Sequence, residues 1–162
     1  MADNDPESMT IIAFSGDLDK LWPTMILSST AAASGMDVTV FYTFWGLFPL
    51  VKEDVRMTGH DAMTKMLAGM NAPAFTRAKL SKLNMGGMGK WMMRKVAHKN
   101  NLLPPEELFA MCLDLGVKMW PCQMTMDLLG IAPDQMVDGL GEPAGAATAL
   151  AQMSRSQISL FI

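Results

Sequence analysis

The chain has 162 residues and a mass of 17.7 kDa, the size of one ordinary domain whose core needs no disulfides or metals. Half of the residues are hydrophobic, yet no apolar run reaches the ~18 residues of a membrane-spanning helix. A net charge of -3 and the lack of a recognised nucleic-acid-binding motif argue against a nucleic-acid partner. We therefore expect a single domain over residues 1–162 that is soluble or peripheral to a membrane.

Few residues are suited to metal or cofactor binding. Two cysteines are too few for a disulfide scaffold, and His60 and His98 lack the spacing of a zinc site. The glycines at 86–89 lack the pattern of a phosphate-binding loop. We expect no cofactor and no metal. The first residues, MADNDPES, carry acids where a secretory signal carries positive charge, so the expected compartment is the cytoplasm.

The first 45 residues predict a strand, a helix and a second strand. MTIIAFSG, residues 9–16, has the apolar β-rich character of a short buried strand. Asp17 is a candidate N-cap for a helix that ends near Gly35. The continuous apolar run DVTVFYTFW, residues 37–45, is typical of a central parallel strand.

A basic, methionine-rich insertion over about 52–101 interrupts this alternation. Eight of the 18 methionines fall between 57 and 93, and no acidic residue lies between Asp61 and Glu106. We predict a short amphipathic helix within 59–75 and a second helix near the end of the basic stretch 79–99. Such a segment either contacts a membrane surface or an acidic partner, or is a solvated basic face around a satellite core.

The remaining segments restore the alternation of strand and helix. PPEELFAMCLDLG, residues 104–116, predicts a helix, and VKMWPC, 117–122, a third strand that ends near its proline. TMDLLG predicts a short helix, APDQMV a further turn, GEPAGAATALAQMS another helix, and ISLFI a terminal strand. The pattern favours an α/β sandwich with a mainly parallel sheet.

In such sheets ligands bind at the carboxyl ends of the strands. Three strand ends here carry polar or reactive residues, and we expect them on one rim. The predicted substrate-binding residues are Ser15, Gly16, Asp17, Lys20, Trp45, Gly46 and Gln123, around Cys122. Cys122 would lie at the start of a helix, where the dipole and free N–H groups lower a thiol pKa.

Each of these residues also has a purely structural interpretation. Cys122 is either a reactive thiolate or a buried small hydrophobe, and Trp45 either lines a pocket or covers the core. Asp17, with Lys20 on the same helix turn, either holds an anion or only caps the helix. Cys112 follows the helical apolar period and is expected in the core. A separation of roughly 15 Å between the cysteines argues against a disulfide.

Three blocks together resemble the DsrE/DsrF-like family, in particular its TFWG-containing branch that is often labelled peroxiredoxin-like. They are IIAFSGDLDK, VTVFYTFWGL and CQMTMDLLGI. The resemblance implies a three-layer α/β/α sandwich with a mainly parallel sheet of about five strands, and homo-oligomers. It also implies that the insertion over about 52–101 differs between family members and is membrane-associated in some of them. No peroxidatic cysteine motif surrounds either cysteine, so the peroxiredoxin label is not supported.

The resemblance implies a small sulfur carrier or sulfurtransferase. Cys122 would accept sulfane sulfur from a donor as a persulfide and pass it to the thiol of an acceptor protein. The alternative hypothesis is a non-catalytic ligand-binding or assembly module that docks on a membrane surface or a partner through the basic methionine-rich segment.

Overall fold

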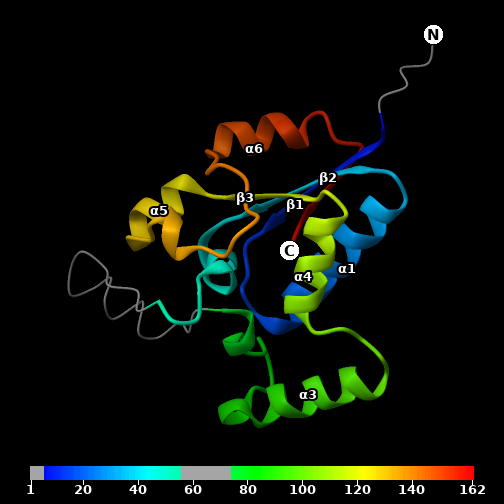
Figure 1. Cartoon of the computed structure of the whole chain (residues 1–162), viewed down its shortest axis with the longest axis vertical. Helices are drawn as coiled ribbons and strands as arrows, with labels where there is room; N and C mark the ends of the chain where they lie inside the picture. Colours follow the sequence, from blue (N-terminus) through cyan, green and yellow to red (C-terminus); the bar gives the residue numbers. More distant parts are fainter. Residues whose placement is uncertain (1–5, 56–73) are drawn as a thin grey trace.

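The computed structural model describes residues 6–55 and 74–162 (Figure 1). Strands and helices alternate along most of the chain. The elements are, in order, β1 (Ser8–Ala13), α1 (Leu18–Ala33), β2 (Asp37–Tyr42), α3 (Met88–Lys99), α4 (Pro105–Asp114), β3 (Lys118–Pro121), α5 (Gln123–Leu129), α6 (Ala146–Met153) and β4 (Ile158–Phe161). Short 3-10 helices cover Phe44–Leu50, Phe75–Arg77, Met85–Gly87 and Pro133–Gln135.

The four strands form one parallel sheet in the order β3-β2-β1-β4. Ala13 pairs with Tyr42, and Tyr42 pairs with Pro121, so the last residues of β1, β2 and β3 lie side by side. The segments that follow these strands therefore start from the same edge. This confirms the predicted parallel sheet and brings the three polar strand ends to one rim.

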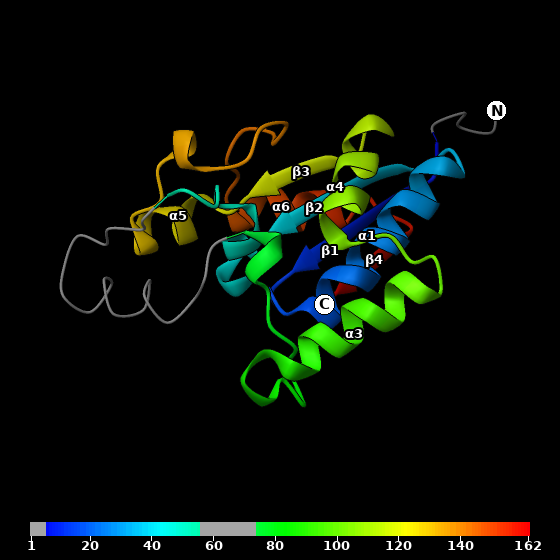
Figure 2. The ribbon, with the colours of Figure 1, turned by 60° about the horizontal axis from the view of Figure 1, so that its bottom comes forward.

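Helices cover both faces of the sheet, as Figures 1 and 2 show. On one face α1 and α4 pack together over the main core, to which the sheet contributes buried residues such as Ile11, Val40 and Met119. On the other face α6 covers a smaller cluster. Its buried members are Ile12, Phe41, Cys122 and Ala149. The predicted three-layer α/β/α arrangement is confirmed.

The sheet has four strands in the described residues, not the expected five. The four strands are the four segments that the apolar pattern picks out. The fifth came from the family resemblance alone. After β2 the chain turns into the 3-10 helix Phe44–Leu50, whose Pro49 lacks a ladder N–H. Val51 then makes only an isolated antiparallel bridge with Met136.

Of the insertion, the structure describes residues 52–55 and 74–101. The helix predicted within 59–75 lies almost entirely outside the described residues, whereas the second predicted helix is α3. Residues 78–80 run past the start of α1, where the Leu18 N–H donates to the Lys79 carbonyl at 2.7 Å. Across the described ranges, no helix combines the length and apolar character needed to cross a bilayer.

Candidate functional site

Cys122 is the N-cap residue of α5, directly after β3. Its N–H donates to the Tyr42 carbonyl at 2.8 Å, which extends the β2–β3 ladder by one residue. Its carbonyl accepts the Met126 N–H at 3.0 Å, the first bond of the helix. Hydrogen bonds to the sheet and within the helix thus fix the backbone of Cys122 on both sides. Its side chain occupies the N-cap position, where a side chain usually meets the free N–H groups of the helix.

Two threonine hydroxyls lie beside this thiol. Thr43 follows β2, and Thr125 is the third residue of α5; their Oγ1 atoms are 3.2 Å apart. The Phe44 N–H donates to Thr125 Oγ1, also at 3.2 Å. A hydroxyl oxygen can accept this bond while its hydrogen donates elsewhere, and both threonine side chains lie within hydrogen-bond reach of the Cys122 sulfur.

The pKa of the Cys122 thiol is the balance of burial and hydrogen bonding. Burial raises the pKa, because only 5% of the residue is exposed. The hydroxyl and N–H of Thr125, the hydroxyl of Thr43 and the N–H of Met124 lower it, and together they outweigh burial. The net pKa of the Cys122 thiol lies below its ordinary value, so the site stabilises the thiolate more than the surroundings of an ordinary cysteine do.

The surroundings of the other cysteine, Cys112, raise its thiol pKa instead of lowering it. Cys112 is fully buried in the main core, and its Sγ lies 3.5 Å from the Met25 carbonyl oxygen. Burial raises the pKa of Cys112 to about 11. Both cysteines are free thiols. The prediction that Cys112 belongs to the core is confirmed, and a neutral buried thiol is a poor nucleophile at neutral pH.

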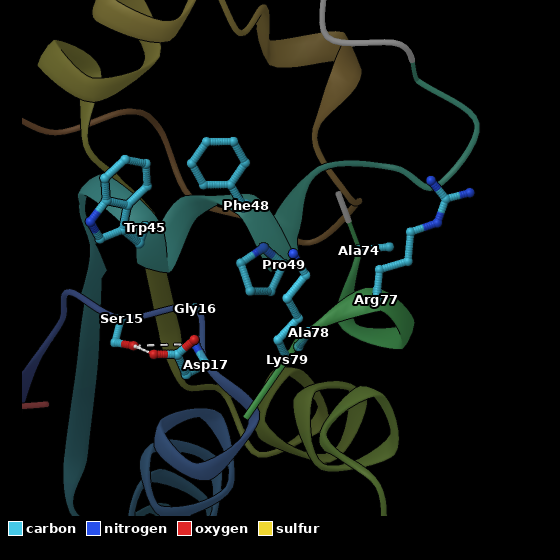
Figure 3. A pocket seen from close by; sticks show the side chains of 10 residues that line it. All are labelled: Ser15, Gly16, Asp17, Trp45, Phe48, Pro49, Ala74, Arg77, Ala78 and Lys79. Atoms are coloured by element: carbon cyan, nitrogen blue, oxygen red, sulfur yellow. Dashed lines mark hydrogen bonds between the residues drawn. The ribbon is translucent and has the colours of Figure 1, made fainter. Parts of the chain in front are cut away.

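A second feature of the same rim is a polar cavity of about 250 Å³ (Figure 3). Ser15, Gly16, Asp17 and Trp45 line it, which brings four of the predicted substrate-binding residues together. The Ser15 hydroxyl donates to Asp17 Oδ2 at 3.0 Å and accepts the Asp17 N–H at 3.2 Å. Asp17 is the N-cap residue of α1, but its carboxylate makes no capping bond to the helix.

Two glycines hold the loops of this rim together. A Cβ on Gly16 would collide with the backbone oxygen of Trp45, and one on Gly46 with the backbone oxygen of Ala13. The Gly46 N–H donates to the Phe14 carbonyl at 2.8 Å. Only a residue without a side chain allows this approach. Gly46 is accordingly a buried part of the loop packing.

The structure divides the predicted site residues into separate groups. In the part of the chain that it describes, neither Cys122 nor Gln123 lines the polar cavity, and Lys20 is an exposed residue on the first turn of α1. Gln123 is exposed and donates from Nε2 to Asp127 Oδ1 at 2.8 Å. Helix α1 packs on the main-core face, whereas Cys122 belongs to the cluster under α6.

Several residues of the site were not predicted from the sequence. Arg77 and Lys79 come from the insertion and line the cavity with Phe48, Pro49, Ala74 and Ala78. Thr125 has a local signal, a hydroxyl residue three positions after a cysteine at a helix start. Among the described residues, no three His, Cys, Asp or Glu side chains group closely enough to hold a metal ion.

The rim also exposes aromatic rings. Phe14 stacks on Phe44 and on Phe161, each with ring centroids 5.8 Å apart. Phe44 has a φ of 51°, in the left-handed region that a phenylalanine seldom adopts. This conformation accompanies the bond from its N–H to Thr125 and leaves its ring partly exposed. The three rings form an apolar surface at the carboxyl end of the sheet.

Comparison with known proteins places this arrangement in a family. The model of the DsrE/DsrF/DrsH-like family matches residues 5–161. The chain belongs to the DsrE/DsrF/DrsH-like family. This confirms the resemblance seen in the three sequence blocks, and the match includes the insertion as well as both ends of the sheet.

Relatives within the family cover almost the whole chain. The sulfur carrier protein DsrE2 of Allochromatium vinosum is 38% identical over 161 residues, 98% of this chain and 99% of that protein. The uncharacterized protein YrkE of Bacillus subtilis is 39% identical over 153 residues, 94% of this chain and 95% of YrkE. A crystal structure of the ychN protein from E. coli matches with a TM-score of 0.57 at 10% identity, covering 96% of this chain and 99% of that one, and supports the DsrE-like fold.

Proposed function

We propose that this DsrE/DsrF/DrsH-like protein is a sulfur carrier that holds sulfane sulfur as a persulfide on Cys122. A role in sulfur relay is supported at the family level by the relative named a sulfur carrier. The observation that carries the residue assignment is the set of donors around Cys122 that lowers its pKa despite burial. Cys112, with its raised pKa, lacks such donors.

The proposed transfer balances without an added oxidant or reductant. The Cys122 thiolate attacks the outer sulfur of a donor persulfide, R–S–SH, and forms a new S–S bond. The donor S–S bond breaks, and its electron pair leaves with R–S⁻. In the second step an acceptor thiolate attacks the outer sulfur of Cys122–S–SH and regenerates the Cys122 thiolate. The donors that stabilise this thiolate also make it a better leaving group.

The polar cavity and the aromatic surface are assigned supporting roles. The cavity around Ser15, Asp17 and Trp45 would receive part of a donor, and the stacked rings of Phe14, Phe44 and Phe161 would contact a partner protein close to the thiol. The proposal also includes a sulfur donor protein, an acceptor protein and assembly of the chain into a homo-oligomer. It places the protein in the cytoplasm, where thiols stay reduced.

The experiment is mass spectrometry of the intact protein after incubation with polysulfide or thiosulfate. We expect an adduct of one sulfur atom that dithiothreitol removes. Cys122→Ser should abolish the adduct, and the matched variant Cys112→Ser should retain it. An adduct that survives Cys122→Ser would overturn the assignment.

A second measurement separates a carrier from a non-catalytic binding module. The rate of alkylation by iodoacetamide, followed against pH, reports the thiolate fraction of each cysteine. A carrier requires an inflection below ~8.5 for Cys122. An inflection at or above this ordinary value would favour the binding module.

A further inference from the structure

The polar cavity has groups of opposite charge in its wall. Ser15 and Asp17 come from the segment before α1, and Arg77 and Lys79 come from the insertion. Figure 3 shows Asp17 and Arg77 at opposite ends of the cavity, with Pro49 and Lys79 between them. The cavity therefore has an anionic end and a cationic end.

The carboxylate of Asp17 and the ammonium group of Lys79 do not neutralise each other. The Leu18 N–H donates to the Lys79 carbonyl at 2.7 Å, so the two segments touch through their backbones. Within residues 6–55 and 74–162, however, neither charged group has an ion-pair partner. Arg77 has only an exposed pair with Glu53 at 3.6 Å, of a kind that contributes little. Opposite charges that share a cavity without meeting complement a ligand that carries both.

The anionic end suits a primary ammonium group. Asp17 Oδ2 accepts the Ser15 hydroxyl at 3.0 Å, and the carboxylate makes no capping bond to α1. Because a carboxylate offers about four acceptor sites, Asp17 can also accept hydrogen bonds from a ligand. The wall of the same cavity includes Trp45, which stacks on Phe48 with ring centroids 5.8 Å apart. The face of an indole ring attracts a cation, which adds to the effect of the carboxylate.

The size of the cavity and its separation from the thiol restrict the ligand further. A volume of about 250 Å³ is below the ~300 Å³ at which pockets for drug-sized ligands begin, so it fits an amino acid or one end of a longer molecule. The aligned strand ends place Ala13 and Pro121 two strand spacings apart, about 10 Å, and Cys122 follows Pro121 directly. An extended peptide of three residues also spans about 10 Å. A thiol peptide of this length, bound by its end in the cavity, matches the distance to Cys122.

We propose that the cavity binds the amino-acid end of a γ-glutamyl thiol peptide. Asp17 would accept hydrogen bonds from its ammonium group, and Lys79 would bind its α-carboxylate. A γ-linked glutamate carries both groups on one carbon, whereas each end of an ordinary peptide carries only one of them. The inference rests on the proposed sulfur-carrier function, to which it adds a small persulfide as a source of sulfur beside a donor protein.

The loading step balances without an oxidant or reductant. The Cys122 thiolate attacks the outer sulfur of the bound peptide persulfide and forms a new S–S bond. The S–S bond of the peptide breaks, and its electron pair leaves with the peptide thiolate, which takes a proton from water. Cys122 then holds the persulfide, and the peptide thiol dissociates from the cavity.

The binding test is calorimetric titration of the full chain with S-methylglutathione, whose blocked sulfur cannot react. We expect saturable binding at one site per chain. Asp17→Asn and Lys79→Gln should each raise the Kd roughly tenfold, because each removes a charge that the ligand contacts. The matched controls are Asp114→Asn and Lys99→Gln, which remove the same charges at exposed ends of α4 and α3 and should leave the Kd unchanged.

A modified probe tests which group contacts Asp17. N-acetyl-S-methylglutathione lacks the ammonium group, so it should bind the wild type roughly tenfold more weakly than S-methylglutathione. Asp17→Asn should weaken its binding no further, whereas Lys79→Gln still should. Equal affinity of the wild type for the two probes would overturn the assignment of the anionic end.

Loading of Cys122, followed by mass spectrometry of the intact protein, separates this inference from the proposed function. Asp17→Asn should lower the loading rate from glutathione persulfide, relative to that from polysulfide, roughly tenfold, and Asp114→Asn should leave this ratio unchanged. Two results would overturn the inference while the sulfur-carrier function stands. They are no binding of S-methylglutathione at millimolar concentration, and loading of Cys122 by polysulfide but not by glutathione persulfide. Failure of both donors to load Cys122 would overturn the proposed function itself.

Discussion

The hydroxyl oxygens of Thr43 and Thr125 lie 3.2 Å apart, although 82 residues separate them in the chain. The contact exists because β2 and β3 are parallel neighbours whose ends are aligned, so the residue after one strand meets the first turn of the helix after the other. Both hydroxyls lower the pKa of Cys122. The sheet register therefore contributes to the lowered pKa of the thiol.

Replacing Thr125 by valine should make Cys122 less reactive. The substitution keeps the shape but removes a hydroxyl that stabilises the thiolate, so the pKa of Cys122 rises. We expect the alkylation rate at pH 7 to fall roughly 3- to 10-fold. Thr30→Val, on the exposed face of α1, is the control and should leave the rate unchanged. Equal rates for Thr125→Val and the wild type would mean that this hydroxyl does not act on the sulfur.

Stability should depend on pH through Cys122. The folded-state pKa of Cys122 is lowered, so between that pKa and the unfolded value of about 8.5 the unfolded chain holds more protons than the folded one. The stabilisation is present above the unfolded value and is lost as pH falls through the folded pKa. The Tm difference between wild type and Cys122→Ala should therefore increase as pH rises through this window. Cys112 is common to both proteins and cancels; a difference that is flat with pH would contradict the lowered pKa.

Gly46→Ala should destabilise the rim. The new Cβ would collide with the backbone oxygen of Ala13, which is fixed in β1 and cannot move aside as a flexible side chain can. We expect a loss of roughly 1–3 kcal/mol in the free energy of unfolding, measured by urea denaturation. Gly145→Ser is the control, because its Cβ meets open space and serine is a favourable N-cap for α6. A Gly46→Ala protein as stable as the control would refute the close approach of the two loops.

Arg94→Met should loosen α3 from the body of the protein. Arg94 makes two bonds to Glu106, at 2.9 and 3.4 Å, and one to the Phe75 carbonyl, whereas apolar burial on this helix is slight. Faster amide hydrogen exchange in residues 88–99, by roughly fivefold for each kcal/mol lost, is the expected readout. Lys118→Met breaks a single exposed ion pair with Asp37 and should leave exchange in α3 unchanged. Unchanged exchange in Arg94→Met would show that other contacts hold the helix.

Local patterns were sufficient to predict the strands and the position of Cys122. The apolar runs that contain β1, β2, β3 and β4 are each recognisable on their own, and Pro121 followed by a helical segment places Cys122 at a helix start. The family resemblance was less accurate about strand number. It implied five, and four are present in the described residues.

The grouping around the thiol needed three-dimensional information. A parallel sheet brings all strand ends to one rim, but it does not say which side chains meet there. Cys122 continues the alternation of Trp120 and joins the cluster under α6, while Asp17 lies at the start of α1, over the other face. The insertion contributes Arg77 and Lys79 to the polar cavity through a path that no local pattern encodes.

The position of β4 in the sheet has a consequence for folding during synthesis. β1 lies between β2 and β4, and Met9 pairs with Ile158, so one edge of β1 has no strand partner until residues 158–161 have left the ribosome. Helix α6, at residues 146–153, is also synthesised after β1, β2 and β3. The face of the sheet that carries Ile12, Phe41 and Cys122 therefore stays uncovered until α6 has been synthesised, and Cys122 is accessible in the nascent chain until then.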